Sequence, residues 1–116
     1  MPGSIIPLSA EPLGVWLAVA AFFAGGIANA TGRPGIRASF TRLGFPGWWC
    51  RVTAALEIAT ALLLLMPSSR ILGIVLGGCI MVAAIAAILG RRLYGHLPPP
   101  VIFLFLLTLA GLGQPA

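Results

Sequence analysis

The 116-residue sequence is almost free of negative charge and contains no lysine. Its only acids are Glu11 and Glu57, and charged residues make up 8% of the chain. Because about a quarter of the residues in a soluble domain are normally charged, this chain has too few charges to cover a water-facing surface. Hydrophobic residues, at 59%, are numerous enough for lipid to face most of the protein. The composition therefore excludes an ordinary soluble domain.

Histidine and cysteine are too scarce for most kinds of bound-metal chemistry. His96 is the only histidine, and Cys50 and Cys79 are the only cysteines. Without closely spaced partners, these residues predict no metal site. The two cysteines lie in apolar segments, so we expect small buried side chains and no disulfide framework. The sequence also lacks nucleotide, phosphate-loop, haem and iron–sulfur motifs, so we expect no protein-bound cofactor.

Four apolar segments predict an all-α protein, an integral membrane four-helix bundle forming a single transmembrane domain over residues 1–116. The predicted spans cover about residues 12–31, 47–66, 71–89 and 98–113. The turn at residues 67–70 is tight, so the second and third spans should be antiparallel neighbours. Gly73 and Gly77 form a pair of small residues one turn apart, which favours close helix packing in lipid.

A short helix at the membrane interface is expected between the first two spans, over residues 36–43. In that helix Phe40 and Leu43 would face lipid, while Arg37 and Arg42 would lie among the headgroups.

The formal net charge of +5 reflects seven arginines that lie between the apolar segments and form no stripe with aromatic residues. We therefore expect no nucleic-acid partner. The loops that follow an odd number of crossings hold most of them: Arg33, Arg37, Arg42, Arg91 and Arg92, with Arg51 just inside the second span. Arg70 is alone on the other side. The positive-inside rule then predicts a multi-pass protein of the cell membrane with these loops in the cytoplasm and both termini outside.

Glu57 is the leading candidate for a catalytic residue. A charged acid at the centre of a membrane helix costs about 2.5–3.5 kcal/mol on insertion scales, so we expect Glu57 to be neutral and to act as a donor. Its helical neighbours are small or hydroxylated, whereas the other side of the segment is rich in leucine. Glu57 should therefore point at the small-residue stripe of the first span, which includes Gly25 and Gly26. The alternative role is a structural hydrogen bond that locks two helices together.

Further residues are candidates for binding a substrate. Thr53 and Thr60 lie on the Glu57 face of the helix, and Asn29 should lie about two turns shallower, where it could orient a ligand oxygen or cap its helix. Arg51 points about 120° away from Glu57, which favours headgroup contact or an anionic substrate head over an ion pair. Tyr94 and His96 favour an interfacial role, and His96 could relay protons.

Three stretches resemble the DoxX-like family of small four-span membrane proteins. They are residues 22–29 (FFAGGIAN), 40–46 (FTRLGFP) and 55–64 (ALEIATALLL). Asn29 stands near the place where members often carry a lysine. The resemblance implies a four-span fold and a link to thiosulfate:quinone oxidoreduction, and similar small bundles also serve as isomerases, cyclases or epoxide-opening enzymes for lipophilic metabolites.

The leading hypothesis is an intramembrane pocket in which Glu57 acts as acid or base on a lipophilic small molecule, in cofactor-free isomerisation, cyclisation or epoxide opening. The alternatives are a quinone-facing accessory subunit of a membrane redox complex, a proton-coupled small multidrug exporter and a purely structural subunit. The partners expected are the lipid bilayer, a lipophilic small molecule or quinone, and a second copy or a redox protein.

Overall fold

The computed structural model describes residues 10–112, and all the regular elements in that range are helical. The α-helices are α1 (Ala10–Ala30), α2 (Pro34–Arg42), α3 (Trp49–Leu65), α4 (Arg70–Gly90) and α5 (Pro98–Leu112). Two short 3-10 helices, η2 (Pro67–Ser69) and η3 (Tyr94–His96), connect α3 to α4 and α4 to α5. The predicted all-α class is confirmed.

The long helices follow the predicted spans to within two residues at each described end, while residue 113, the predicted end of the fourth span, lies outside the described range. Within residues 10–112 three segments are long and apolar enough to cross a membrane, namely Leu13–Ala30, Pro67–Gly90 and Tyr94–Leu112. Helix α3 has 17 residues, because a turn at Gly47 and Trp48 precedes it and Pro67 follows it closely. At 1.5 Å per residue it is about 26 Å long.

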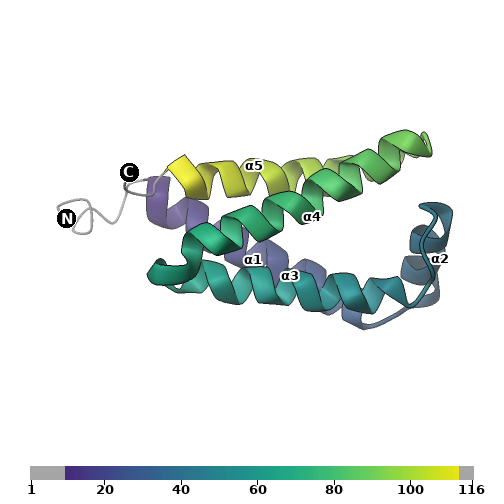
Figure 1. Ribbon diagram of the computed structural model, residues 1–116, viewed down its shortest axis with the longest axis horizontal. Helices are drawn as coiled ribbons and strands as arrows, with labels where there is room; N and C mark the ends of the chain where they lie inside the picture. Colours follow the sequence, from purple (N-terminus) through teal and green to yellow (C-terminus); the bar gives the residue numbers. More distant parts are fainter. Residues whose placement is uncertain (1–9, 113–116) are drawn as a thin grey trace.

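The four long helices pack side by side. Helices α1 and α4 each contact both α3 and α5, and α3 and α4 are antiparallel neighbours joined by η2, as the tight turn predicted. The start of α1, the end of α5 and η2 lie at one end of the molecule, and α2 lies at the other (Figure 1). We call these the η2 end and the α2 end.

Glycines allow the helices to approach closely. A Cβ atom at Gly26 would lie 2.6 Å from Ile58 Cγ1, so a side chain there would separate α1 from α3. On α4, Gly73 and Gly77 are both buried against α3, as the small-residue pair predicted. At Gly77 a Cβ would lie 2.9 Å from Thr60 Cγ2 and 3.0 Å from Phe22 Cζ. These contacts fix the helix spacing at the centre of the protein.

The side chains in the η2 half form a solid core. The buried apolar cluster comprises Val15, Ala18, Val19, Phe22, Ala61, Leu64, Met81, Leu107 and Ala110. Phe22 closes this cluster toward the α2 half with an edge-on contact to Phe103, with ring centroids 5.0 Å apart. The α2 half contains the cavity described below.

Arg70, the single arginine of the η2 end, has a local structural role. Its Nε donates to the Leu64 carbonyl at 2.8 Å, and Ser69 Oγ donates to the Leu63 carbonyl at 2.9 Å. Both bonds satisfy carbonyls of the last turn of α3, which lack partners within the helix.

The other six arginines lie near the α2 end, and two of them pack on glycines with positive φ. Gly32 (φ 63°) faces the guanidinium of Arg51, and Gly44 (φ 97°) faces that of Arg91. The Gly44 contact brings the loop after α2 against the end of α4.

Two details of the sequence prediction were wrong. Phe40 and Leu43 were expected on the lipid side of α2, but they are half-buried and line the cavities between the helices, because α2 lies over that space and turns its apolar side inward. Cys50 is buried as expected, but Cys79 is exposed on the outer face of α4, since the opposite face of that helix carries Gly73 and Gly77.

The Gly77 contacts predict a large difference between two neighbouring positions. Gly77→Leu should lower the free energy of unfolding by about 1–3 kcal/mol, because the added atoms overpack a close helix crossing. Gly78→Leu is the matched control, since a Cβ at Gly78 meets no atom within 4 Å. Thermal unfolding in detergent would measure both variants. Equal stability of the two would contradict the packing described here.

Candidate functional site

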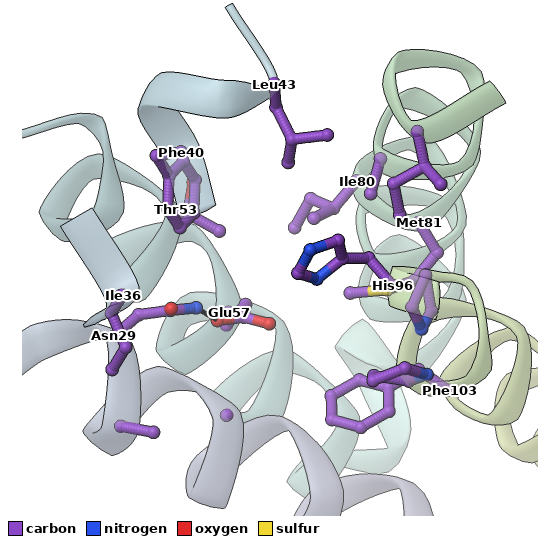
Figure 2. A pocket seen from close by; sticks show the side chains of 16 residues that line it. Asn29, Ile36, Phe40, Leu43, Thr53, Glu57, Ile80, Met81, His96 and Phe103 are labelled. Carbon is purple, nitrogen blue, oxygen red and sulfur yellow. Dashed lines mark hydrogen bonds between the residues drawn. The ribbon is translucent and has the colours of Figure 1, made fainter. Parts of the chain in front are cut away.

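A cavity of about 330 Å³ occupies the α2 half of the protein, and we call it the chamber. Side chains from all five α-helices and from η3 surround it, so segments from the whole chain contribute to its wall (Figure 2). The lining residues are Gly25, Ala28, Asn29, Ile36, Phe40, Leu43, Thr53, Glu57, Ile80, Met81, Ala84, Ile88, His96, Pro99, Pro100 and Phe103. Most of them are apolar, and the few polar groups come from three different elements.

The carboxyl group of Glu57 lies in the wall of this chamber. The residue is 5% exposed, and Asn29 Nδ2 donates a hydrogen bond to its Oε1 at 2.6 Å. The carboxyl fits between α1 and α3 because Gly25 has no side chain, and a Cβ there would lie 3.2 Å from Glu57 Oε2. The sequence prediction that Glu57 faces the glycine stripe of the first span is therefore confirmed.

The second carboxyl oxygen, Oε2, receives no hydrogen bond from any protein group between residues 10 and 112. Two other polar side chains that line the chamber, Thr53 and His96, likewise make no side-chain hydrogen bond within the described part of the chain. In Figure 2 the Glu57 carboxyl points into the cavity and the His96 ring projects toward it from the opposite side. The chamber thus offers three groups that can exchange hydrogen bonds with a ligand.

One family model matches a part of the chain that contains all of these residues. The model of the DoxX-like family matches residues 13–110. This chain belongs to the DoxX-like family. It is a membrane protein with long apolar helices, and the matched region runs from α1 to α5, including the whole chamber. Comparisons with curated proteins and with solved structures gave no match.

The chamber of this DoxX-like protein contains only part of the predicted site. Glu57, Asn29, Thr53 and His96 line it together. Thr60 is fully buried outside it, with Oγ1 bonded to the Leu56 carbonyl at 2.8 Å. Arg51 is exposed beside Gly32, and Tyr94 is 56% exposed at the α2 end. The structure therefore brings four candidates into one cavity and leaves three outside it.

The predicted depth of Asn29 was wrong, because Asn29 contacts Glu57 directly. Counting residues from the helix ends assumed that α1 and α3 end at the same level. In the structure Gly32, beyond the end of α1, already faces Arg51, so the first residues of α3 extend past α1. This offset reduces the difference in depth to a distance that the two side chains bridge.

Sequence reasoning missed the apolar part of the wall, notably Phe103 and Met81. Both lie in continuously apolar segments, where the composition carries no signal that distinguishes a residue lining a cavity from one facing lipid. Gly25, in contrast, was predicted as part of the small-residue stripe, because a large carboxyl on one helix needs a gap on the helix that faces it.

The arrangement suits proton exchange with an uncharged ligand better than metal binding. No group of three histidine, cysteine or acidic side chains gathers anywhere in residues 10–112. With Oε1 held by Asn29, Oε2 is the carboxyl oxygen that can carry a proton to a ligand or accept one from it.

The Asn29–Glu57 bond predicts an energetic coupling between α1 and α3. A double-mutant cycle of Asn29→Ala and Glu57→Ala should give a coupling energy between about 0.6 and 1.7 kcal/mol, which are the average and the maximum measured for hydrogen bonds between membrane helices. Unfolding in detergent would measure it.

Thr31→Ala, combined with Glu57→Ala, provides the control for this cycle. Thr31 lies at the same end of α1, but its hydroxyl bonds to the Ala28 carbonyl of its own helix at 2.6 Å. Its coupling to Glu57 should be near zero, and a coupling as large as that of Asn29 would argue against a specific bond.

Proposed function

We propose that this DoxX-like protein binds a lipophilic small molecule in the chamber and that Glu57 exchanges a proton with it. The observation that carries the proposal is the state of the carboxyl group: Asn29 holds Oε1 at 2.6 Å, and Oε2 faces a largely apolar cavity of about 330 Å³ without a protein partner among residues 10–112. Apolar cavities of this size with a few convergent polar groups are typical of small-molecule sites.

The chain forms a single membrane domain of four spans in this proposal. Helix α3 is too short to count among the three clear spans, but it packs against both α1 and α4. Its outward side chains are apolar, as in Leu56 and Leu62, which are 38% and 52% exposed. The exposed aromatic residues Trp16 and Trp48 lie near opposite ends of the helices, as interfacial anchors do.

The orientation follows from the arginines. Six lie near the α2 end and only Arg70 lies at the η2 end, where the α3 carbonyls accept hydrogen bonds from its guanidinium. The positive-inside rule places the α2 end in the cytoplasm and the η2 end, with both termini, outside the cell membrane.

Cofactor-free isomerisation is the reaction that needs the fewest additional components. In its ionised form Glu57 Oε2 would accept a proton from one carbon of the ligand, and the electron pair of the broken C–H bond would shift a double bond. The carboxyl would exchange its proton with solvent and then deliver one to a second carbon of the ligand. The atoms balance within one molecule and no oxidant is consumed. His96 or Thr53 would stabilise the charge that develops on a ligand oxygen.

An isotope experiment tests this function and identifies the substrate at the same time. Wild-type protein in nanodiscs, incubated in D₂O with the total neutral lipid extract of its host, should introduce deuterium into a defined lipid species. Glu57→Gln should reduce the incorporation at least about 100-fold, since acid–base catalysis contributes 10²–10⁴-fold. Mass spectrometry would measure the incorporation.

Thr60→Val is the control for Glu57→Gln, because Thr60 lies on the same helix outside the chamber and should leave the incorporation unchanged. Deuterium incorporation by Glu57→Gln at the wild-type rate would refute the proposed role. Recovery of bound quinone without isotope exchange would favour the quinone-binding alternative.

The orientation predicts the accessibility of two cysteines introduced into a variant that lacks Cys50 and Cys79. Cysteine at exposed Ser68, in η2, should react with a membrane-impermeant maleimide in intact cells. Cysteine at exposed Ala38, in α2, should react only after permeabilisation. Reaction of both sites in intact cells would contradict a crossing by α3.

A further inference from the structure

A second cavity of about 250 Å³ lies directly beside the chamber. Five residues line both spaces: Phe40, Leu43, Thr53, Ile80 and Ala84. The others that line the second cavity are Phe45, Trp49, Leu56 and Ala83. We call this second cavity the side groove. Apart from Thr53 its wall is apolar, so it suits a hydrocarbon chain and offers little to a polar group.

The groove results from the way α3 and α4 diverge. The two helices are in close contact near η2, where Gly73 and Gly77 pack on Leu64 and Thr60, and they separate toward the α2 end (Figure 1). Helix α2 covers the wedge between them with Phe40 and Leu43 (Figure 2). The rings of Phe45 and Trp49 stack at 5.9 Å and form a further part of the wall.

The side groove reaches the outer surface of the protein. Leu56 is 38% exposed and Ala83 is exposed, and both lie on the outward sides of their helices. In a bilayer this surface faces lipid chains. The groove thus connects the hydrocarbon region of the membrane with the space in front of Glu57.

The charges around the two cavities discriminate between ligand head groups. None of the seven arginines lines the chamber or the side groove, although six lie near this end of the molecule. The polar groups that line the chamber are the carboxyl of Glu57, the Asn29 amide, the Thr53 hydroxyl and the His96 ring. A phosphate or carboxylate head would lie near the Glu57 carboxyl without a guanidinium partner, which is unfavourable in a site shielded from water.

We infer that the ligand is a single-chain lipid with an uncharged oxygen head group, such as an unsaturated long-chain alcohol or ketone, whose head lies at Glu57 and whose chain occupies the side groove. It enters sideways from the bilayer between α3 and α4. This inference rests on the proposed function and adds the ligand class and the route of entry.

Photolabelling tests this inference with a hexadecanol probe that carries a diazirine in its chain. In phosphatidylcholine nanodiscs the probe should label the peptides that contain Trp49, Leu56 and Ala83. Unlabelled hexadecanol should compete, whereas palmitic acid and hexadecyl phosphate should not. Ala84→Phe, which fills the junction of the two cavities, should reduce the specific labelling about tenfold.

Ala86→Phe is the matched control, because Ala86 is exposed on the same helix and lines neither cavity. It should label like the wild type. Ala83→Phe, at an exposed position, blocks only the outer groove and replaces Ala84→Phe if that variant does not fold.

The outcomes separate this inference from the proposed function. Undiminished labelling in the folded blocking variant, or equal competition by palmitic acid, overturns the inference. If Glu57→Gln then still abolishes isotope exchange, the proposed function stands with a different ligand. Isotope exchange that does not depend on Glu57 overturns both.

Discussion

The close approach of α1 and α3 is the constraint on which the rest of this structure depends. In lipid no hydrophobic force drives two apolar helices together, so van der Waals contact and hydrogen bonds must hold them. Gly26 allows the van der Waals contact, because the α1 backbone can lie against Ile58. The Asn29–Glu57 bond is the hydrogen bond between the two helices. Gly25 leaves room for the carboxyl in between. The acid thus helps to join two helices with one oxygen while the other remains available to a ligand, so its structural and chemical roles are compatible.

The protein divides along its length into a solid half and a hollow half. The buried apolar cluster that includes Val15 and Ala110 fills the η2 half. In the α2 half, α3 and α4 diverge around a cavity. Glu57 lies where the two halves meet, beside Phe103, which lines the chamber and packs on Phe22 of the core. A carboxyl deeper in the solid half would have no space in front of it, and one nearer the α2 end would lie close to the arginines and to water.

Much of this arrangement could be predicted from the sequence because strong physical signals determine it. Apolar segment length located the long helices, the turn at Pro67 made α3 and α4 neighbours, and the small residues around Glu57 showed which side of α3 faces the interior. The level at which Asn29 lies depends on how far one helix slides past another, which no local pattern records. The inward side of α2 and the apolar chamber wall were missed for a similar reason: a residue that faces lipid and one that lines an apolar cavity have the same chemistry.

The contact between Gly44 and the guanidinium of Arg91 joins two segments whose neighbouring residues Leu43 and Ile88 line the chamber. It holds the loop after α2, the roof of the chamber, against the end of α4, only a few residues before His96. A glycine backbone and a planar guanidinium are both thin, so the two segments can lie close together where these groups meet. Gly44 therefore allows the closest approach between the loop after α2 and the end of α4. Any other residue would be strained at the φ of 97° and would push the Arg91 guanidinium aside, so the seam between these two segments depends on a side chain that is missing.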